Sequence, residues 1–204
     1  MPLKVRGLEE ALVELLRRAA VKLPEDVEKA LKRALEVETS EAGKTQLKAI
    51  LENVRMAGEK GRPLCQDTGI PSFYVRGEGL DFKALREALR RATVRASRLI
   101  PLRPSVVHPL TRKNTGDNTG REIPSILWLG EGGEGLEITV VLKGAGSENS
   151  SVLRMIPPGE GVEGVKRAVL EAVAKAGGQP CPPTILNLGL GGTADLAFTL
   201  AKKA

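Results

Sequence analysis

The chain changes character at residues 63–76, which read PLCQDTGIPSFYVR. A proline and a run of polar residues come first. Ile70–Arg76 then has the β-branched and aromatic residues that are typical of a short strand. The preceding residues 1–62 have the apolar spacing of helices instead. This stretch therefore predicts where a helical layer ends and a mixed region of strands and helices begins.

Three amphipathic helices are expected before residue 63. Apolar residues recur in each at the 3.6-residue spacing of a helix, Pro24 opens the second helix, and Gly61 ends the third. The connections are short, which favours antiparallel packing. The apolar positions are Leu8, Leu12, Leu15, Leu16 and Ala19 in the first helix, Val27, Leu31, Ala34 and Leu35 in the second, and Leu47, Ile50, Leu51 and Val54 in the third.

On the carboxyl side of this stretch, helices alternate with separated strands. Asp81 can cap a helix whose apolar stripe runs from Phe82 to Leu99, and residues 101–122 form a long polar connection. Further strands are expected at 123–129, 136–142 and 184–190, and further helices at 162–176 and 193–203. The sequence predicts an α+β fold in which a helical N-terminal layer packs on a small mixed β-sheet with further helices.

Composition limits the class of protein. The 204 residues are 41% hydrophobic, which is enough for one domain over residues 1–204, with 1–62 as the helical layer and 63–204 as the part that carries the site loops. No apolar run approaches a membrane span, and the charged N-terminus does not resemble an export signal. Two cysteines do not make a disulfide framework. We therefore expect a soluble, cytoplasmic protein.

The net charge of +6 suits anionic partners, either nucleic acid or small carboxylates. Aromatic residues make up only 2% of the chain. This scarcity argues against a specific single-stranded nucleic-acid surface, because such surfaces stack bases on aromatic side chains. A surface rich in Arg and Glu is also typical of proteins adapted to high temperature.

Four loops carry polar or reactive residues that a core does not need. The first, Cys65–Gly69, places a thiol, an amide, a carboxylate and a hydroxyl in succession before a strand, although a buried cysteine beside an Asx turn has the same residues. In the second, Arg112–Gly120, two cations precede hydrogen-bonding side chains and glycines. Its arginine could bind a carboxylate through two parallel hydrogen bonds, or the loop could be a solvated turn.

The third loop, Lys143–Ser150, has glycines that let a backbone approach an anion, but it lacks the spacing of a nucleotide phosphate loop. The fourth begins at Cys181 and ends in Gly189–Ala194, which fits the loose dinucleotide pattern. We reject that reading, because the sequence lacks the second strand and acidic residue that the motif needs. His108, the single histidine, is interpreted as structural or as a substrate contact, and not as a metal ligand.

Together and in this order, the four loops resemble the class I fumarate hydratase and L-tartrate dehydratase family, in its alpha subunit or in the N-terminal domain of its single-chain members. The resemblance covers nearly the whole chain. It implies a hydro-lyase that hydrates or dehydrates a small dicarboxylic acid, with fumarate/malate first and tartrate second. The residues that carry it are PLCQDTG at 63–69, RKNTGDN at 112–118, KGAGSEN at 143–149, CPPT at 181–184 and GGTAD at 191–195.

In that family three cysteines hold a [4Fe–4S] cluster, and its fourth iron binds the substrate's hydroxyl and a carboxylate as a Lewis acid. The resemblance implies that Cys65 and Cys181 are two of the cluster's ligands. The family's third cysteine lies downstream of its Cys-Pro-Pro motif, and the sequence has no cysteine after Cys181. We therefore expect a further segment or another chain to supply it, and this chain alone not to hold the cluster in the family's manner.

The resemblance also implies roles at the substrate. Gln66 and Asp67 would contact it, with Asp67 as the catalytic residue in proton transfer. Arg112 would bind a substrate carboxylate, and the backbone of Gly144 and Gly146 would line the pocket. Hydration of a double bond flanked by carboxylates needs an acid, a base and cations, and of these groups the loops provide a thiolate, a carboxylate and a guanidinium.

A partner is implied as well. The family's other charge-stabilising groups lie on a beta subunit or a C-terminal domain, in a homo-oligomer or heterotetramer. Two alternatives stay open: a catalytically incomplete subunit that serves assembly or regulation, and a basic nucleic-acid-binding module. The missing third cysteine motivates the first of these, and the positive charge motivates the second.

Overall fold

The structure, a computed structural model, describes residues 7–130, 132, 135–181 and 183–204. Residues 1–6, on which the expectation of no export signal depends, and Pro182 of the Cys-Pro-Pro motif lie outside the described residues. The chain divides into two units, residues 1–142 and 143–204, and each is described by itself. The expectation of one domain over residues 1–204 stays a prediction. None of the described helices combines the length and the apolar character that a membrane crossing requires.

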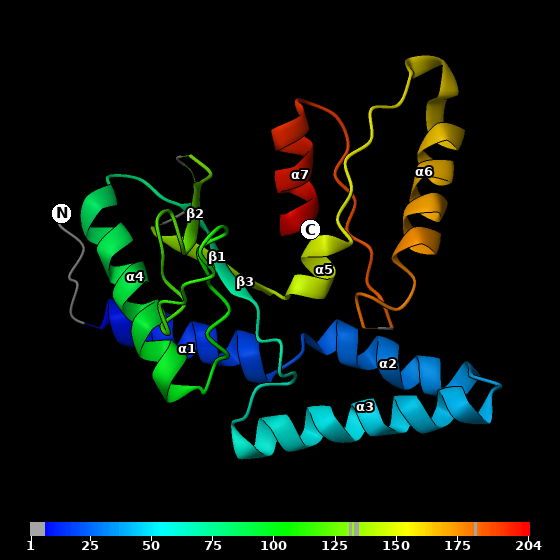
Figure 1. The fold of residues 1–204 in the computed structure, drawn as a ribbon, viewed down its shortest axis with the longest axis horizontal. Helices are drawn as coiled ribbons and strands as arrows, with labels where there is room; N and C mark the ends of the chain where they lie inside the picture. Colours follow the sequence, from blue (N-terminus) through cyan, green and yellow to red (C-terminus); the bar gives the residue numbers. More distant parts are fainter. Residues whose placement is uncertain (1–6, 131, 133–134, 182) are drawn as a thin grey trace. The chain divides into compact units, whose positions relative to one another are not determined.

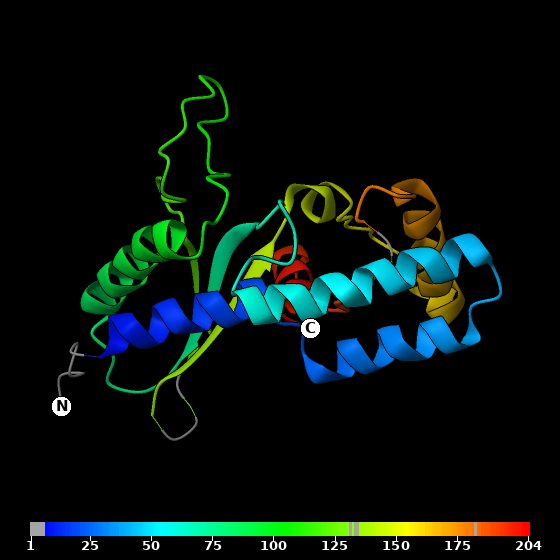
Figure 2. The same cartoon turned by 90° about the horizontal axis from the view of Figure 1, so that it is seen from below.

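The first unit begins with three helices where the sequence predicts them, α1 (Leu8–Val21), α2 (Glu25–Val37) and α3 (Glu41–Lys60). The helices α2 and α3 pack on each other and lie side by side in both views (Figure 1, Figure 2). In contrast, α1 packs mainly on α4 (Phe82–Leu99). The predicted cap of α4 is confirmed, because the Asp81 carboxylate accepts a hydrogen bond from the backbone N–H of Ala84 at 3.0 Å.

The strand β1 (Ile70–Arg76) lies in the middle of a three-stranded sheet, between β2 (Ser125–Trp128) and β3 (Glu137–Lys143). The strands β1 and β2 run parallel, with Ser72 opposite Ser125. A parallel pair cannot be joined by a tight turn, so the chain returns through α4 and the long connection that follows it. These helices and strands confirm the α+β fold class.

The core of the first unit lies between β1 and two helices. Phe73 and Val75 pack with Leu16 of α1 and Leu89 of α4, and none of the four side chains is more than 1% exposed. Burying a side chain of this size contributes about 1.5–3 kcal/mol relative to leaving it in water. This contact confirms that part of the N-terminal helical layer packs on the sheet.

The second unit contains α5 (Ala145–Asn149), the 3-10 helix Pro158–Glu160, α6 (Gly161–Ala176) and α7 (Ala194–Lys203). The strand predicted at 184–190 is wrong, because these residues have no regular structure. Alternating apolar residues form a strand only beside another strand, and the described part of this unit offers no free edge to them. Their side chains are left exposed, with Ile185 at 66% and Leu188 at 53%.

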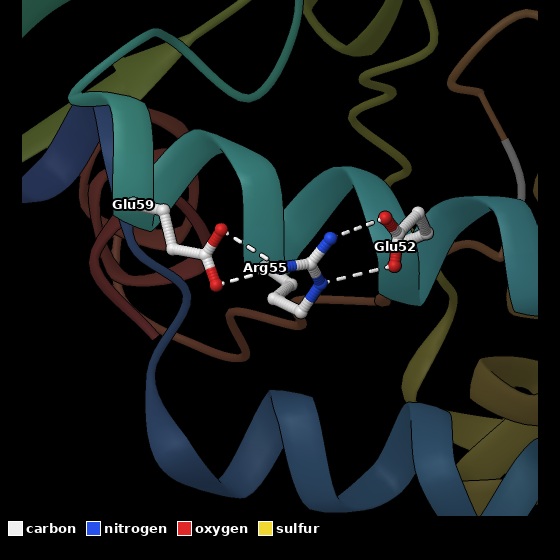
Figure 3. Close-up of polar contacts among 3 residues, drawn as sticks. All are labelled: Glu52, Arg55 and Glu59. Atoms are coloured by element: carbon white, nitrogen blue, oxygen red, sulfur yellow. Dashed lines mark hydrogen bonds and ion pairs between the residues drawn. The ribbon is translucent and has the colours of Figure 1, made fainter.

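An exposed ion cluster lies on α3, where Arg55 sits between Glu52 and Glu59 (Figure 3). The guanidinium donates to Glu52 at 2.5 and 3.1 Å and to Glu59 at 2.7 and 2.8 Å. The hydrogen bonds from Arg55 lower the pKa of Glu52, and those to both carboxylates raise the pKa of Arg55. Exposed pairs of this kind add little at room temperature, but such networks matter more at high temperature. Adaptation to heat stays a prediction.

Replacing Phe73 with Ala should lower the free energy of unfolding by about 3–5 kcal/mol, because the change leaves a cavity at the centre of the core. Phe82→Ala is the matched control. Phe82 is 55% exposed and makes an edge contact with Trp128 at 4.4 Å between ring centroids. Its loss should cost no more than about 1.5 kcal/mol. Urea unfolding followed by circular dichroism compares the variants, and equal losses would contradict this placement of the core.

Candidate functional site

The loop Cys65–Gly69 is attached to two helices at its entrance. The backbone N–H of Leu64 donates to the carbonyl of Ala20 in α1 at 2.9 Å. The side-chain amide of Asn53 in α3 donates to the carbonyl of Leu64 at 2.8 Å. Both backbone polar groups of Leu64, the residue before Cys65, are therefore bonded to the helical layer. The sequence did not predict this role of Asn53, because Asn53 lies in the middle of α3 and belongs to no recognisable motif.

Beyond this attachment, the loop presents three functional groups. Cys65 and Gln66 are exposed and Asp67 is half-buried. The backbone N–H of Asp67 donates to the Cys65 Sγ at 3.4 Å, a contact that suits a sulfur carrying negative charge. The buried Thr68 then accepts a hydrogen bond from the backbone N–H of Arg103 at 2.9 Å. The loop is thus fixed on both sides of an exposed thiol.

The long polar connection after α4 stands out from the unit as a projecting loop (Figure 2). Its base is held by Asn118, whose side chain is fully buried. The Asn118 Oδ1 accepts from the backbone N–H of Ser105 at 2.8 Å, and its Nδ2 donates to the Ser97 hydroxyl at 3.0 Å. One asparagine therefore joins the two arms of the loop to the end of α4. Asn118 belongs to the motif that carries the family resemblance, yet here its side chain has a structural role.

Asp117 is the charged residue at this base. Burial alone would raise its pKa, but hydrogen bonds from the hydroxyl and the backbone N–H of Thr119, at 2.7 and 3.0 Å, and the charge of Arg90 hold the pKa below its usual value. Its contribution to stability is therefore present above the pKa of the unfolded chain and is lost as pH falls through the lower folded value. We interpret Asp117 as a structural anion and not as a catalytic acid.

The far end of the projecting loop is a tight turn between His108 and Lys113. The His108 N–H donates to the Lys113 carbonyl at 2.8 Å, and the Arg112 N–H donates to the His108 carbonyl at 2.9 Å. The imidazole Nδ1 accepts from the N–H groups of Leu110 and Thr111 at 3.3 and 3.2 Å. Arg112 adopts the left-handed backbone conformation with φ of 60°, and it is exposed. His108 thus has the structural role that was one of its two interpretations.

In the second unit, the glycine loop lies against the chain that leads to Cys181. A Cβ atom at Gly146 would lie 2.5 Å from the carbonyl oxygen of Gln179, so the position has no room for a side chain. Two residues later the Cys181 N–H donates to the Gly178 carbonyl at 3.3 Å. The third and fourth loops of the sequence are therefore neighbours. Gly144, the N-cap residue of α5, opens the same loop.

Cys181 itself adopts a left-handed backbone conformation, with φ of 58°, and it is exposed. That conformation costs a residue with a Cβ atom roughly 1–2 kcal/mol. Strain of this kind is concentrated at functional sites, where a fixed direction of the side chain is useful. Arg112, Asn118 and Glu122 share this left-handed conformation, so it assigns no role to Cys181 by itself.

Lys143 is a cation at this loop that sequence reasoning did not assign. Its Nζ lies 2.7 Å from the Ser151 hydroxyl, and both residues are half-buried. A second contact joins Lys202 of α7 to Glu148 of α5 at 2.8 Å. Its position could have identified Lys143, because it is the last residue of a strand and a glycine loop follows directly.

The first unit contains Cys65 and the second unit contains Cys181. Among the residues that the structure describes, no three His, Cys, Asp or Glu side chains converge as a metal site would require. Both cysteines are free thiols, which are the usual ligands of iron–sulfur clusters. As donors, the two thiols fit such a cluster in part, because a [4Fe–4S] cluster takes more ligands than two. The predicted residues are Cys65, Gln66, Asp67 and Arg112 in the first unit, and Gly144, Gly146 and Cys181 in the second.

Replacing Gly146 with Ala should destabilise the second unit by roughly 1–3 kcal/mol, because the new methyl group would force the Gln179 carbonyl away. Gly178→Ala is the matched control, since no atom lies within 4 Å of a Cβ at that position in the same turn. Hydrogen exchange of residues 143–204 measures the effect. Equal exchange in both variants would contradict the close approach of the two loops.

Comparison with known proteins identifies the family of the chain. The model of the fumarate hydratase (Fumerase) family matches residues 9–204. The chain is 46% identical over 203 residues to a putative L(+)-tartrate dehydratase subunit alpha from Methanocaldococcus jannaschii, covering 97% of this chain and 71% of that relative. It is 32% identical over 208 residues to the L(+)-tartrate dehydratase subunit alpha of Escherichia coli, covering 98% and 67%.

A third relative is a putative fumarate hydratase class I from Geobacillus stearothermophilus, 31% identical over 206 residues, which cover 96% of this chain and 40% of the relative. The chain thus spans 40% to 71% of the lengths of these three proteins. The matched region begins before Cys65 and continues past Cys181, so it includes all four loops. The chain therefore belongs to the class I fumarate hydratase and L-tartrate dehydratase family of hydro-lyases, as a chain of the alpha-subunit type.

Proposed function

We propose that the chain is the alpha-type part of an enzyme that reversibly removes water from a small dicarboxylic acid. The observation that supports this most is the family match over residues 9–204, which includes both cysteines and all four loops. Two of the three relatives named above are tartrate dehydratase subunits. L(+)-tartrate therefore stands before fumarate and malate as the substrate, which reverses the order expected from the sequence.

The cofactor that we propose is a [4Fe–4S] cluster held in part by Cys65 and Cys181. Both thiols are exposed on loops whose backbones are fixed by hydrogen bonds. When bound, such a cluster supplies a Lewis-acidic iron. A further segment or another chain would supply the third ligand, because the sequence has only two cysteines.

The chain's own residues would bind and orient a dianion. Arg112 would hold one carboxylate through two parallel hydrogen bonds, and the Gln66 amide would donate to a substrate oxygen. Asp67, half-buried beside the thiol of Cys65, would move the proton during hydration. The backbone at Gly144–Gly146 would line the pocket without side chains to block it.

The partner that we propose is a beta subunit, or the corresponding C-terminal domain, in a homo-oligomer or heterotetramer. Two of the relatives bear the name subunit alpha, which supports a partner of this kind. We place the protein in the cytoplasm, where exposed thiols stay reduced. We expect no specific nucleic-acid partner, because five aromatic residues are too few for a surface that stacks bases. We also expect no membrane partner.

A second function stays open beside this one. The protein could serve as a catalytically incomplete subunit that assembles with, or regulates, an active enzyme of the same family; residues 1–204 contain two cysteines. Such a subunit would bind the beta partner without holding a cluster. The experiment that follows separates the two functions.

Anaerobic iron–sulfur reconstitution, with and without a co-produced beta subunit, tests the proposal. The complex should bind about four iron atoms per chain with the visible absorbance of a cluster, and should convert tartrate or fumarate. Cys65→Ser and Cys181→Ser should each abolish iron binding, because a thiolate ligand is lost. Thr184→Ser, in the loop that follows Cys181, is the control and should bind iron normally. A stable complex without iron would overturn the enzymatic proposal and support the incomplete subunit.

Replacing Arg112 with Lys in the complete enzyme should lower kcat/KM by about tenfold or more, because a lysine keeps the charge but loses the two parallel hydrogen bonds. Lys113→Ala is the matched control: it removes a neighbouring charge and should have a small effect. Steady-state kinetics on tartrate and fumarate measure both variants. Near-normal kinetics for Arg112→Lys and Arg112→Ala alike would show that the loop is a solvated turn.

A further inference from the structure

We propose that His108 is a positioning residue for Arg112. Its imidazole holds the turn in which Arg112 adopts a left-handed backbone, and this conformation sets the direction of the guanidinium. The inference rests on the proposed function, in which Arg112 binds a substrate carboxylate. It assigns a specific task to the single histidine of the chain.

The turn is built around one imidazole nitrogen. The Nδ1 of His108 accepts hydrogen bonds from two successive backbone N–H groups, those of Leu110 at 3.3 Å and Thr111 at 3.2 Å. The His108 carbonyl accepts the next N–H, that of Arg112, at 2.9 Å. Three consecutive N–H groups therefore point at His108, and the last of them belongs to the arginine.

The side chain of His108 takes part in this turn as a hydrogen-bond acceptor through Nδ1. A side chain without an acceptor would leave both N–H groups without a partner in the turn.

Apolar packing does not hold the turn in its place. The side chain of Leu110 is 87% exposed, and His108 and Arg112 are exposed too. The buried Asn118 fixes the base of the projecting loop, where it bonds to Ser105, but its contacts end well before the tip. Local hydrogen bonds are therefore the interactions that define the far end of the loop, and His108 provides three of the acceptor contacts.

The hydrogen bonds to His108 matter because they hold Arg112 in an unfavourable backbone conformation. The left-handed region, here with φ of 60°, is unfavourable for a residue with a Cβ atom, so Arg112 adopts it only while the turn is held. Release of the turn would let the residue return to ordinary backbone conformations with a different side-chain direction. Binding a carboxylate would then require ordering the turn first, which weakens the affinity.

The experiment uses the complete enzyme with its beta partner and three variants. His108→Ala removes the acceptor. His108→Asn restores one, because an asparagine oxygen can accept the N–H two residues ahead in an Asx turn. Thr111→Ala is the matched control, since it changes the same turn but keeps the backbone N–H. Each variant is tested by steady-state kinetics on the dicarboxylate and by the rate of trypsin cleavage after Arg112, followed by mass spectrometry.

His108→Ala should raise KM about tenfold with a smaller change in kcat, and should speed the cleavage after Arg112 severalfold, because the released turn fits a protease better. His108→Asn should return both values to within about twofold of the original, and Thr111→Ala should leave both unchanged. This rescue distinguishes positioning from a general loss of structure.

Two results would overturn the inference. Cleavage that does not change in His108→Ala would show that the histidine does not hold the turn. Faster cleavage with an unchanged KM would show that the turn does not position Arg112, provided that Arg112→Ala does raise KM. If Arg112→Ala leaves KM unchanged, the proposed carboxylate contact is itself wrong, and the positioning role is overturned with it.

Discussion

The burial of β1 on both faces is the constraint on which the first unit depends. Phe73 and Val75 face the helices α1 and α4, and the intervening Tyr74 is 2% exposed on the other side of the strand. A shift by one residue would remove Phe73 and Val75 from their contacts with α1 and α4 and turn Tyr74 toward these helices. The register of β1 therefore fixes where Cys65–Gly69 ends, since that loop runs directly into the strand.

Hydrogen bonds carry this rigidity outward to the site. Asn53 and Ala20 fix Leu64, the residue before Cys65, and Asn118 joins the arms of the projecting loop. Each of these bonds uses a backbone group of a loop, and the partner of the Leu64 N–H lies in α1, at Ala20. Loops held in this manner can present polar side chains to a substrate without an apolar cluster of their own, which is what a site for a dianion requires.

The sequence predicted the elements of the core better than the contacts of the loops. Periodicity located the helices, because their apolar faces record the core directly, and residue type located the strand Ile70–Arg76. Periodicity failed at residues 184–190, where alternation exists but no neighbouring strand is described. Asn118 and His108 could be singled out as polar loop residues, yet their partners could not be inferred. Their roles depend on which backbone groups meet them after folding, and no spacing rule records that.

The position of β1 in the middle of the sheet also has a consequence during synthesis of the protein. Its partner β2 follows about fifty residues later, as the pairing of Ser72 with Ser125 shows. The nascent strand therefore leaves the ribosome before either neighbour exists, with an apolar segment that could pair with other chains. Pro71 lacks an N–H for such pairing, and Arg76 adds a charge at the other end. These two residues would protect the emerging strand from aggregation until the sheet can close.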